Sequence, residues 1–209
     1  MNHETPKNPP NNIDTEAHRQ IARGSAEEDY SDRLIVEQIV SGQKDLFRLL
    51  IKRYERAVYG MGLSFFRNAE DASDFAQEVF IKLFRNLVRF EGRSRFSTWL
   101  YKIAYNTAVN GVNRRKEYRS LAEDVYDIEA NENETPERLF IRSAAREAVL
   151  NSLQDLPERY RVCIDLFFFY ERSYQEIELI TGFPVNTIKS HVYRAKKLLR
   201  EKLEDSGVL

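Results

Sequence analysis

Apolar residues in the first half of the chain recur at helical spacing. Two runs place them one, three or four positions apart: Leu46, Phe47, Leu50, Ile51, Tyr54, Val58 and Met61, then Phe75, Val79, Phe80, Leu83, Phe84 and Leu87. Each run forms one apolar stripe along a helix. A third helix is expected over Ser97–Arg115, capped by Ser97 or a neighbour. No segment alternates with period two for long enough to predict a strand, so these helices should form a small bundle.

The last third of the chain is also predicted to be helical, in shorter pieces. A helix is expected over Pro136–Gln154. Pro157 is well suited to be the first residue of the next helix, which should run to about Tyr170. Ser173 and Glu176 lie three positions apart and predict a capping box that opens a short helix.

A tight turn is predicted after that short helix. Gly182 can adopt the positive φ that ends a helix, and Pro184 can begin the next one. Spacings of three and four put the apolar positions of this next helix on one face: Val185, Ile188, Val192, Ala195 and Leu199. Other positions present small polar or basic side chains: Asn186, Thr187, Lys189, Ser190, His191, Arg194 and Lys197. Such side chains suit base edges and phosphates in a major groove, so the pattern predicts a helix-turn-helix.

The other interpretation of this segment is an ordinary helical hairpin with a solvated polar face. Pro184–Arg200 contains five basic residues and no acidic one, which favours DNA binding because solvated faces normally mix both signs of charge. His191 has no second His or Cys near it, so we expect a groove-facing hydrogen-bond donor rather than a metal ligand.

The charges are segregated, although the net charge of the 209 residues is only −1. Lys82–Arg119 holds ten basic and two acidic residues, whereas Leu121–Glu137 holds seven acidic residues and no basic one. Together with the basic block near the C-terminus, this predicts two surfaces that face phosphate, separated by an acidic stretch.

This distribution divides the chain into two domains. Residues 120–136 lack helical periodicity and are predicted to be a flexible acidic linker. The N-terminal domain then covers residues 31–119, and the C-terminal domain covers residues 137–205. Residues 1–30 have no apolar core and are predicted to be a disordered tail rather than a secretory signal.

Several classes of protein are disfavoured by composition. The single cysteine, Cys163, lies in an apolar run and is expected to be a buried thiol, so neither a disulfide nor a cysteine-based zinc site is predicted. No stretch of about 18 apolar residues exists, so we expect no membrane insertion and a cytoplasmic protein. Two of the three histidines lie in the tail and no Gly-rich phosphate loop is present, so we expect no catalytic residues, metal or cofactor.

The segment Phe90–Asn106 interleaves aromatic and basic residues. Aromatic rings stack on unpaired bases while Arg and Lys hold the backbone, which is the general means of binding a single strand. The same apolar residues could instead belong to the core, and for Trp99 the core is the favoured interpretation.

Four segments resemble, in order, the conserved regions of the extracytoplasmic-function (ECF) sigma factors. Asp71–Phe80 and Phe96–Asn106 are similar to the second region of that family, and Leu153–Arg161 and Pro184–Ala195 to its fourth. Several motifs in one order are far more specific than any one of them. The resemblance implies an all-α protein of two small helical domains joined by a flexible linker. Its expected function is to bind core RNA polymerase and promoter DNA and to direct transcription initiation.

The resemblance also implies roles for particular residues. Asp74, Gln77 and Glu78 would dock on the clamp helices of core RNA polymerase. The −10 element would be melted and read as a single strand by Phe90, Arg93, Arg95, Trp99, Lys102, Tyr105, Asn106, Asn110 and Asn113. The predicted helix-turn-helix would read the −35 element as a duplex. An anti-sigma factor is a further expected partner, by family analogy alone.

Two other functions stay open at this point. A helix-turn-helix transcriptional activator would share the C-terminal pattern, but it needs a receiver or ligand domain that the helical N-terminal half does not offer. An enzyme has little support because candidate catalytic groups are scarce. Adding the purified chain to core polymerase separates the three, since only a sigma factor gives promoter-specific transcription without another sigma factor.

Overall fold

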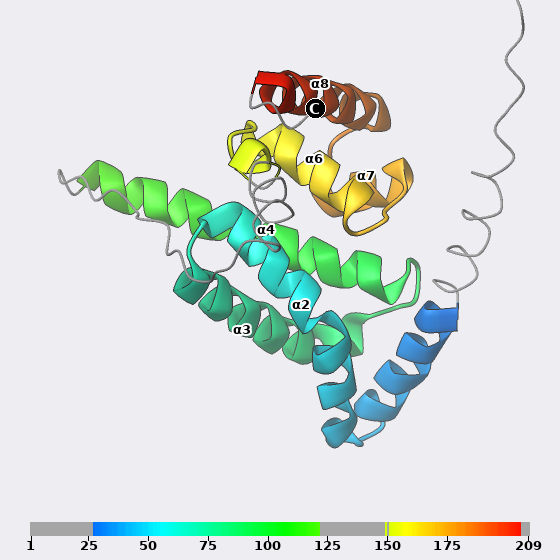
Figure 1. Cartoon of the computed structure of the whole chain (residues 1–209). Helices are drawn as coiled ribbons and strands as arrows, with labels where there is room; N and C mark the ends of the chain where they lie inside the picture. Colours follow the sequence, from blue (N-terminus) through cyan, green and yellow to red (C-terminus); the bar gives the residue numbers. More distant parts are fainter. Residues whose placement is uncertain (1–26, 122–148, 150, 206–209) are drawn as a thin grey trace, which may run out of the picture.

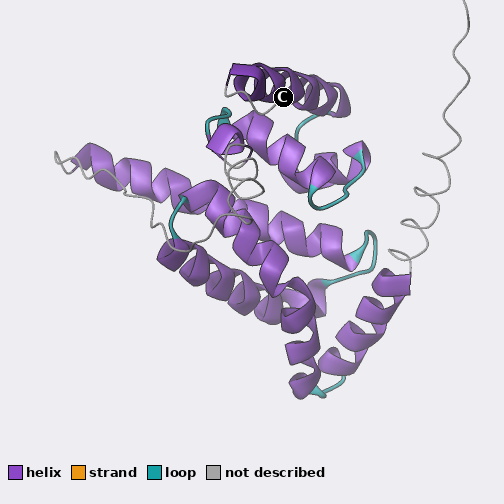
Figure 2. Ribbon diagram, in the orientation of Figure 1, coloured by secondary structure: helices purple, strands orange, loops and turns teal. Residues whose placement is uncertain are grey.

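The computed structural model describes residues 27–121, 149 and 151–205. Most of the predicted tail, most of the predicted linker and the first part of the helix predicted over residues 136–154 lie outside these ranges. Every regular element in the described ranges is a helix, as the all-α prediction requires (Figure 2). The elements are a helix over residues 27–40, η1 (Lys44–Leu46), α2 (Phe47–Phe66), α3 (Ala69–Asn86), η2 (Leu87–Arg89), α4 (Phe96–Leu121), helical residues 149 and 151–154, α6 (Glu158–Phe168), α7 (Tyr174–Thr181) and α8 (Val185–Asp205).

Helices α2, α3 and α4 form the predicted bundle. α2 and α3 approach closely at Gly62, where a Cβ atom would lie 2.8 Å from the Phe75 ring and 3.0 Å from the Cα atom of Ala72. α3 begins at Asn68, whose side chain accepts a hydrogen bond from the Asp71 amide at 3.0 Å. The stripes predicted from the sequence face one another in a core that includes Leu50, Val58, Val79, Leu83 and Leu100.

The helix over residues 27–40 belongs to this bundle, and it starts before the boundary predicted at residue 30. Asp32 is buried and accepts hydrogen bonds from the Tyr54 hydroxyl and the Arg53 guanidinium. Burial raises the pKa of Asp32, and these two partners oppose that effect. Asp29 accepts a hydrogen bond of 2.8 Å from the Phe96 amide at the start of α4. These long-range partners explain why the ordered helix extends into a segment that looks like tail in the sequence.

In the C-terminal domain α6, α7 and α8 pack around apolar residues that include Cys163, Leu166, Ile177 and Ile188. Pro157 lies at the N-cap of α6, one position before its predicted place inside the helix. Cys163 is fully buried, as expected, and burial raises the pKa of its thiol to about 12. The thiol is therefore protonated at neutral pH and acts as a small apolar side chain.

The two domains are packed against each other in this structure. α6 and α7 lie over α2 and α4, as Figure 1 shows. One cluster of buried apolar residues is continuous through both domains. The rings of Tyr101 and Tyr170 meet across the boundary with centroids 5.1 Å apart. Within the described ranges, no helix is both long and apolar enough to cross a membrane.

Candidate nucleic-acid and partner interfaces

Helices α7 and α8 form the predicted helix-turn-helix. Ser173 and Glu176 make both hydrogen bonds of a capping box at the start of α7. Gly182 has a φ of 77°, the left-handed conformation that ends α7. The Val185 amide donates to the Glu178 carboxylate at 3.1 Å, so α7 also caps the start of α8. Each of these features was predicted from the sequence except the last, which joins the two helices.

The polar face of α8 is open to solvent. Five of the predicted −35 residues are exposed and Thr187 is half-buried; the exposed ones are Asn186, Lys189, Ser190, Arg194 and Lys197. An Arg194 Nη atom lies 3.3 Å from the Tyr160 hydroxyl on α6, which limits the directions the guanidinium can take. Lys197 forms a 3.8 Å ion pair with Glu201 on the same helix. The basic surface expected from the sequence is therefore present and accessible.

His191 does not lie on that surface, and its predicted role as a groove-facing donor is wrong. The side chain is buried, with its Nδ1 atom 3.7 Å from the Cys163 sulfur. Its ring packs against Tyr160 and Phe183. Burial and the nearby positive charges of Arg159 and Arg194 lower the pKa of His191. A neutral, buried ring is part of the core between α6 and α8.

Four of the predicted −10 residues form one exposed stripe along α4. Lys102, Asn106, Asn110 and Asn113 are exposed and lie four, four and three positions apart. Trp99 lies one turn earlier on the same face, half-buried against the rings of Phe90 and Phe96. The stripe therefore begins at an aromatic cluster and continues as amides.

Tyr105 lies on a different face of α4, away from that stripe. Its ring packs edge-on against Phe65 of α2, and burial raises the pKa of its hydroxyl. Glu158 and Cys163 of α6 also raise this pKa. In this arrangement Tyr105 does not lie on the exposed stripe that carries Asn106.

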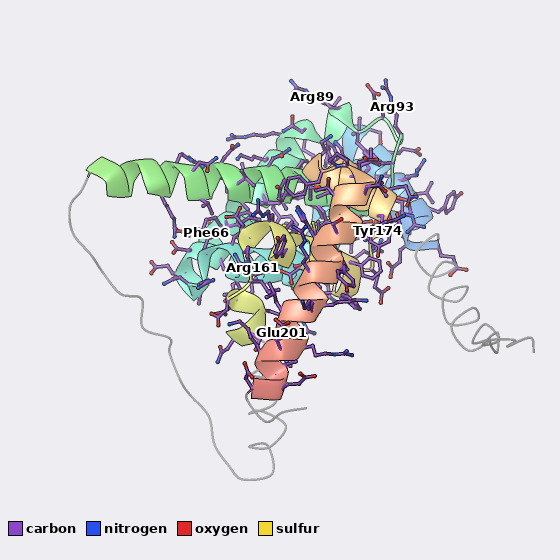
Figure 3. The ribbon with its side chains drawn as sticks, turned by 90° about the horizontal axis from the view of Figure 1, so that it is seen from above. Phe66, Arg89, Arg93, Arg161, Tyr174 and Glu201 are labelled. Carbon is purple, nitrogen blue, oxygen red and sulfur yellow. The ribbon has the colours of Figure 1, made fainter. Side chains whose placement is uncertain are left out.

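The loop before α4 is held at two points and carries an outward arginine. Arg33 donates to the Ser94 carbonyl oxygen at 3.3 Å. Arg95 reaches across to α7, where a guanidinium nitrogen lies 3.7 Å from Glu176. Arg93 pairs with Glu91 and its side chain is 84% exposed. Arg89 and Arg93 project from the same edge of the molecule (Figure 3).

A polar cleft of about 490 Å³ runs between α3 and α4 beside the amide stripe. It is lined by Glu78, Lys82, Asn110, Asn113 and Arg114. Glu78 forms ion pairs with Lys82 at 2.6 Å and with Arg114 at 3.6 Å. The sequence motifs did not single out Lys82 and Arg114, which place positive charge next to the predicted −10 residues.

The predicted polymerase-binding residues are divided between two faces of α3. Gln77 is exposed on a groove of about 760 Å³ between α2 and α3. Asp74 and Glu78 instead line a cleft on the α4 side of the helix. The walls of the Gln77 groove are mainly apolar and include Phe47, Ile51, Ala76, Phe80, Ile81 and Phe84. Ile81 is 50% exposed and Phe84 is 39% exposed, so this apolar surface has no cover in the described part of the chain.

Comparison with known proteins identifies relatives for both domains. The family model for sigma-70 region 2 matches residues 50–118, and that for sigma-70 region 4 matches residues 146–199. The RNA polymerase sigma-H factor of Pseudomonas aeruginosa is 35% identical over 181 residues, which cover 83% of this chain and 94% of that protein. The ECF RNA polymerase sigma-E factor of Escherichia coli is 35% identical over 186 residues, covering 85% and 96%.

The chain belongs to the ECF family of RNA polymerase sigma factors. This sigma factor is a non-enzymatic subunit that directs RNA polymerase to promoters. Region 2 contains α2, α3 and α4, and region 4 contains α6, α7 and most of α8.

Two solved structures share the fold of this sigma factor. CnrH in complex with the cytosolic domain of CnrY aligns with a TM-score of 0.61 and 23% identity, covering 83% of this chain and 97% of that one. The sigma factor RpoE of Bartonella quintana, in complex with the anti-sigma factor NepR, aligns with a TM-score of 0.62 and 22% identity, covering 76% and 96%.

Proposed function

We propose that this sigma factor uses three separate surfaces: the α2/α3 groove for core polymerase, the α4 stripe for the −10 single strand and the α8 face for the −35 duplex. The observation that supports this division is that each surface has a different chemistry. The groove is mainly apolar, the stripe consists of one lysine and three amides beside aromatic rings, and the α8 face is basic. A polymerase subunit needs these three contacts at once.

The groove suits a helical partner. Apolar side chains exposed along two neighbouring helices accept the apolar face of a third helix. Core polymerase offers such helices at its clamp, as membership of the family implies. Gln77 lies on the wall of the groove and can bond polar groups at the edge of the contact, whereas Glu78 already has two basic partners. We therefore propose that Asp74 and Glu78 contribute less to polymerase binding than Gln77 does.

Gln77→Lys and Asp74→Lys test this assignment as a matched pair on one helix. Gln77→Lys places a charge in the apolar groove, so co-purification with core polymerase should fall at least tenfold, an energy of about 1.4 kcal/mol. Asp74→Lys introduces the same side chain outside the groove and should reduce co-purification much less. Helicity measured by circular dichroism should match wild type for both. Equal losses, or a larger loss for Asp74→Lys, would contradict the groove assignment.

The α4 stripe is proposed to hold the melted −10 strand. An amide both donates and accepts hydrogen bonds, so Asn106, Asn110 and Asn113 can read base edges. Phe90 and Trp99 lie at the start of the stripe, where a base can stack. Lys102, Arg93 and Arg95 supply positive charge for the strand's phosphates.

The α8 face is proposed to enter the major groove of the −35 element. Lys189, Arg194 and Lys197 are directed to solvent, and the helix has no acidic residue before Glu201. Asn186, Thr187 and Ser190 are short enough to let the helix approach base edges. The buried His191 packs α8 against α6 and is not proposed to contact DNA.

The proposed function also implies a further protein partner and a location in the cell. RpoE of Bartonella quintana was solved with an anti-sigma factor, and we propose that an anti-sigma factor also controls this chain. Binding to core polymerase and promoter DNA places the protein in the cytoplasm. Capture of such a partner by the full chain, with loss of polymerase binding, would support this control. Unchanged polymerase binding in the captured complex would contradict it.

A further inference from the structure

The loop that leads into α4 is fixed at its end by a distant side chain. This loop, residues 90–95, connects η2 to α4. The Phe96 amide at the start of α4 donates a 2.8 Å hydrogen bond to Oδ1 of Asp29, in the helix over residues 27–40. The first amides of a helix have no partner within it, so a carboxylate at this point caps the helix and stabilises the positive end of its dipole. The side chain that caps α4 therefore comes from 67 positions earlier in the chain.

Arg33, one turn after Asp29, contacts the same loop along its backbone. It donates from Nε to Oδ2 of Asp29 at 3.0 Å and from Nη2 to the Ser94 carbonyl oxygen at 3.3 Å. Gly92 has a φ of +69°, and a Cβ atom there would lie 3.2 Å from Nη1 of Arg33. The guanidinium therefore lies against the loop at both Gly92 and Ser94, and Asp29 fixes its direction.

Arg93 lies between these two contacts. Its side chain is 84% exposed, pairs with Glu91 of the same loop and projects from the edge of the molecule (Figure 3). Because the backbone on both sides of Arg93 lies against the Arg33 guanidinium, the direction in which Arg93 points depends on Arg33. A loop held in its binding shape loses less conformational entropy when a strand binds than a flexible loop does.

We infer that Asp29 and Arg33 are positioning residues for recognition of the −10 strand: they hold the 90–95 loop in the shape that presents Phe90 and Arg93 to the DNA. This inference rests on the proposed function for the identity of what the loop contacts, whereas the bracing of the loop does not. Asp29 lies in the segment that the sequence predicts to be a disordered tail, so part of that segment takes part in the site.

The same helix is attached to the bundle by a second contact, which provides a control. Arg53 of α2 donates to the buried Asp32 carboxylate and to the Ser31 hydroxyl at 3.4 Å. In the described part of the chain, the hydrogen bonds of the Arg53 side chain go to this helix and none goes to the loop. Replacing Arg53 therefore weakens the attachment of the helix without removing a contact with the loop.

Backbone NMR order parameters of the free full-length chain test the bracing without DNA or polymerase. In the wild type the 90–95 loop should be rigid, with values of about 0.8, and in Arg33→Met they should fall below about 0.6. The melting temperature of Arg33→Met should change little, because an ion pair that is 40% exposed on the arginine side contributes little stability. Arg53→Met is the same substitution and should do the opposite. It should lower the melting temperature, because the buried Asp32 loses its ionic partner, and leave the loop rigid.

Two results of this comparison would overturn the bracing. One is a wild-type loop that is already flexible. The other is an equal change of the loop in Arg33→Met and Arg53→Met.

Asp29→Asn separates the two parts of the brace. The amide keeps an oxygen that can accept from Phe96, but its other atom becomes a donor that faces Nε of Arg33. The Phe96 amide should therefore keep its protection from hydrogen exchange, while the order parameters of the loop fall as in Arg33→Met. A loop that stays rigid in Asp29→Asn would overturn the role of Asp29 in orienting Arg33.

The effect on recognition is measured with core polymerase and the full chain on a promoter fragment mapped with this sigma factor, together with its single-base variants in the −10 element. Arg93→Ala first gives the profile of open-complex loss across the −10 positions that this arginine accounts for. Arg33→Met should reproduce that profile with a smaller loss, roughly two- to tenfold, because the Arg93 guanidinium is present but no longer held in place. Arg53→Met should keep the wild-type profile. A wild-type profile in Arg33→Met would overturn the positioning role.

The double variant Arg33→Met/Arg93→Ala distinguishes positioning from a direct contact. If Arg33 acts through Arg93, the double variant should lose no more open complex than Arg93→Ala alone, within about twofold. Losses that multiply would show that Arg33 contacts DNA itself and would overturn its role as a positioning residue. No loss in Arg93→Ala at any position would instead contradict the proposed function of the loop, and the order parameters of the free chain would still decide the bracing.

Discussion

The two proposed DNA-reading helices differ in how much of their surface is covered by the packing of the two domains. The polar face of α8 is open to solvent along its length. The N-terminal half of α4, in contrast, contacts α7 through Thr98 and the loop before α7 through Ser97 and Tyr101. The surface for duplex DNA is thus already formed and accessible. The proposed surface for the single strand lies beside the interface between the two domains. One of its basic residues, Arg95, forms an ion pair there with Glu176 of α7.

The two helices also differ in the chemistry of their exposed side chains. α8 offers lysines and arginines, which suit the phosphates of a duplex and bind in a salt-dependent way. α4 offers a row of asparagines, whose amides suit base edges that are exposed only after melting. Duplex recognition should therefore be measurable with the free chain. Single-strand recognition should depend on core polymerase and on separation of α4 from the C-terminal domain.

The largest expected effect is on α8. Arg194→Ala should weaken binding of the free chain to its −35 duplex by about 1–3 kcal/mol, roughly 5- to 150-fold, and relax the preference at one base pair. Lys197→Ala is the comparison, because its side chain is also exposed but is ion-paired to Glu201. That variant should weaken binding to all sequences alike and lower the salt slope by about one. Quantitative gel shifts at several salt concentrations measure both.

A uniform loss across sequences in Arg194→Ala would show that this arginine only positions the helix. No loss in either variant would show that α8 does not face the duplex.

A smaller effect is expected on α4. Asn106→Ala removes one base-edge contact, so open complex should fall about five- to tenfold, with polymerase binding and closed-complex formation nearly unchanged. Permanganate reactivity of unpaired thymines near −10 measures the open complex directly. Asn151→Ala is a matched control, since that asparagine is also exposed and helical but lies in the C-terminal domain. Wild-type reactivity and base preference in Asn106→Ala would remove Asn106 from the reading surface.

The smallest effect concerns the pH dependence of the closed state, in which α6 and α7 pack against α2 and α4. Burial raises the pKa of Asp165 to about 6, against the hydrogen bond from Ser64 and the charge of Arg161, which lower it. The closed state therefore favours the protonated acid. This stabilisation is complete below the ordinary pKa of 3.8 and is lost as pH rises through about 6. Lowering the pH from about 7.5 to about 5.5 should raise the closed-to-open ratio about two- to threefold, because part of the burial comes from α6 itself.

Asp165→Asn imitates the protonated form, so it should be more closed at about pH 7.5 and lose most of this pH dependence. Energy transfer between dyes at Lys52→Cys on α2 and Glu204→Cys on α8, two exposed positions, reads both changes. A pH dependence that survives in Asp165→Asn would assign the titration to another group. Glu176 is not that group in this range, because its pKa is lowered.

Local features of the fold could be predicted from the sequence because they depend on neighbours in the chain. The helical stripes of α2 and α3, the capping box of Ser173 and Glu176, and the positive φ of Gly182 all involve residues within one or two turns. The burial of His191 could have been predicted too. Its spacing from Ile188 and Ala195 is three and four, which places it on the buried stripe rather than the polar face.

Features that depend on distant partners could not be predicted in this way. The charge of Glu78 is engaged by Arg114, 36 positions away, and Thr98 meets Glu176 at a separation of 78. The sequence did contain a local indication of the apolar groove, although the helical pattern alone did not identify the residues that line it. Phe80, Ile81, Leu83 and Phe84 are too many adjacent apolar residues for one buried face, so some of them had to be exposed.

The most direct test of the central claim is transcription by core polymerase with and without the purified chain on genomic DNA of the source organism, with the 5′ ends of the transcripts mapped. We predict new start sites that share two upstream elements at a fixed spacing, near −10 and −35. These starts should disappear with Gln77→Lys, and those with Arg194→Ala should lose the preference at one base of the upstream element. Start sites identical to those of core polymerase alone would contradict the assignment of this chain as the promoter-recognition subunit.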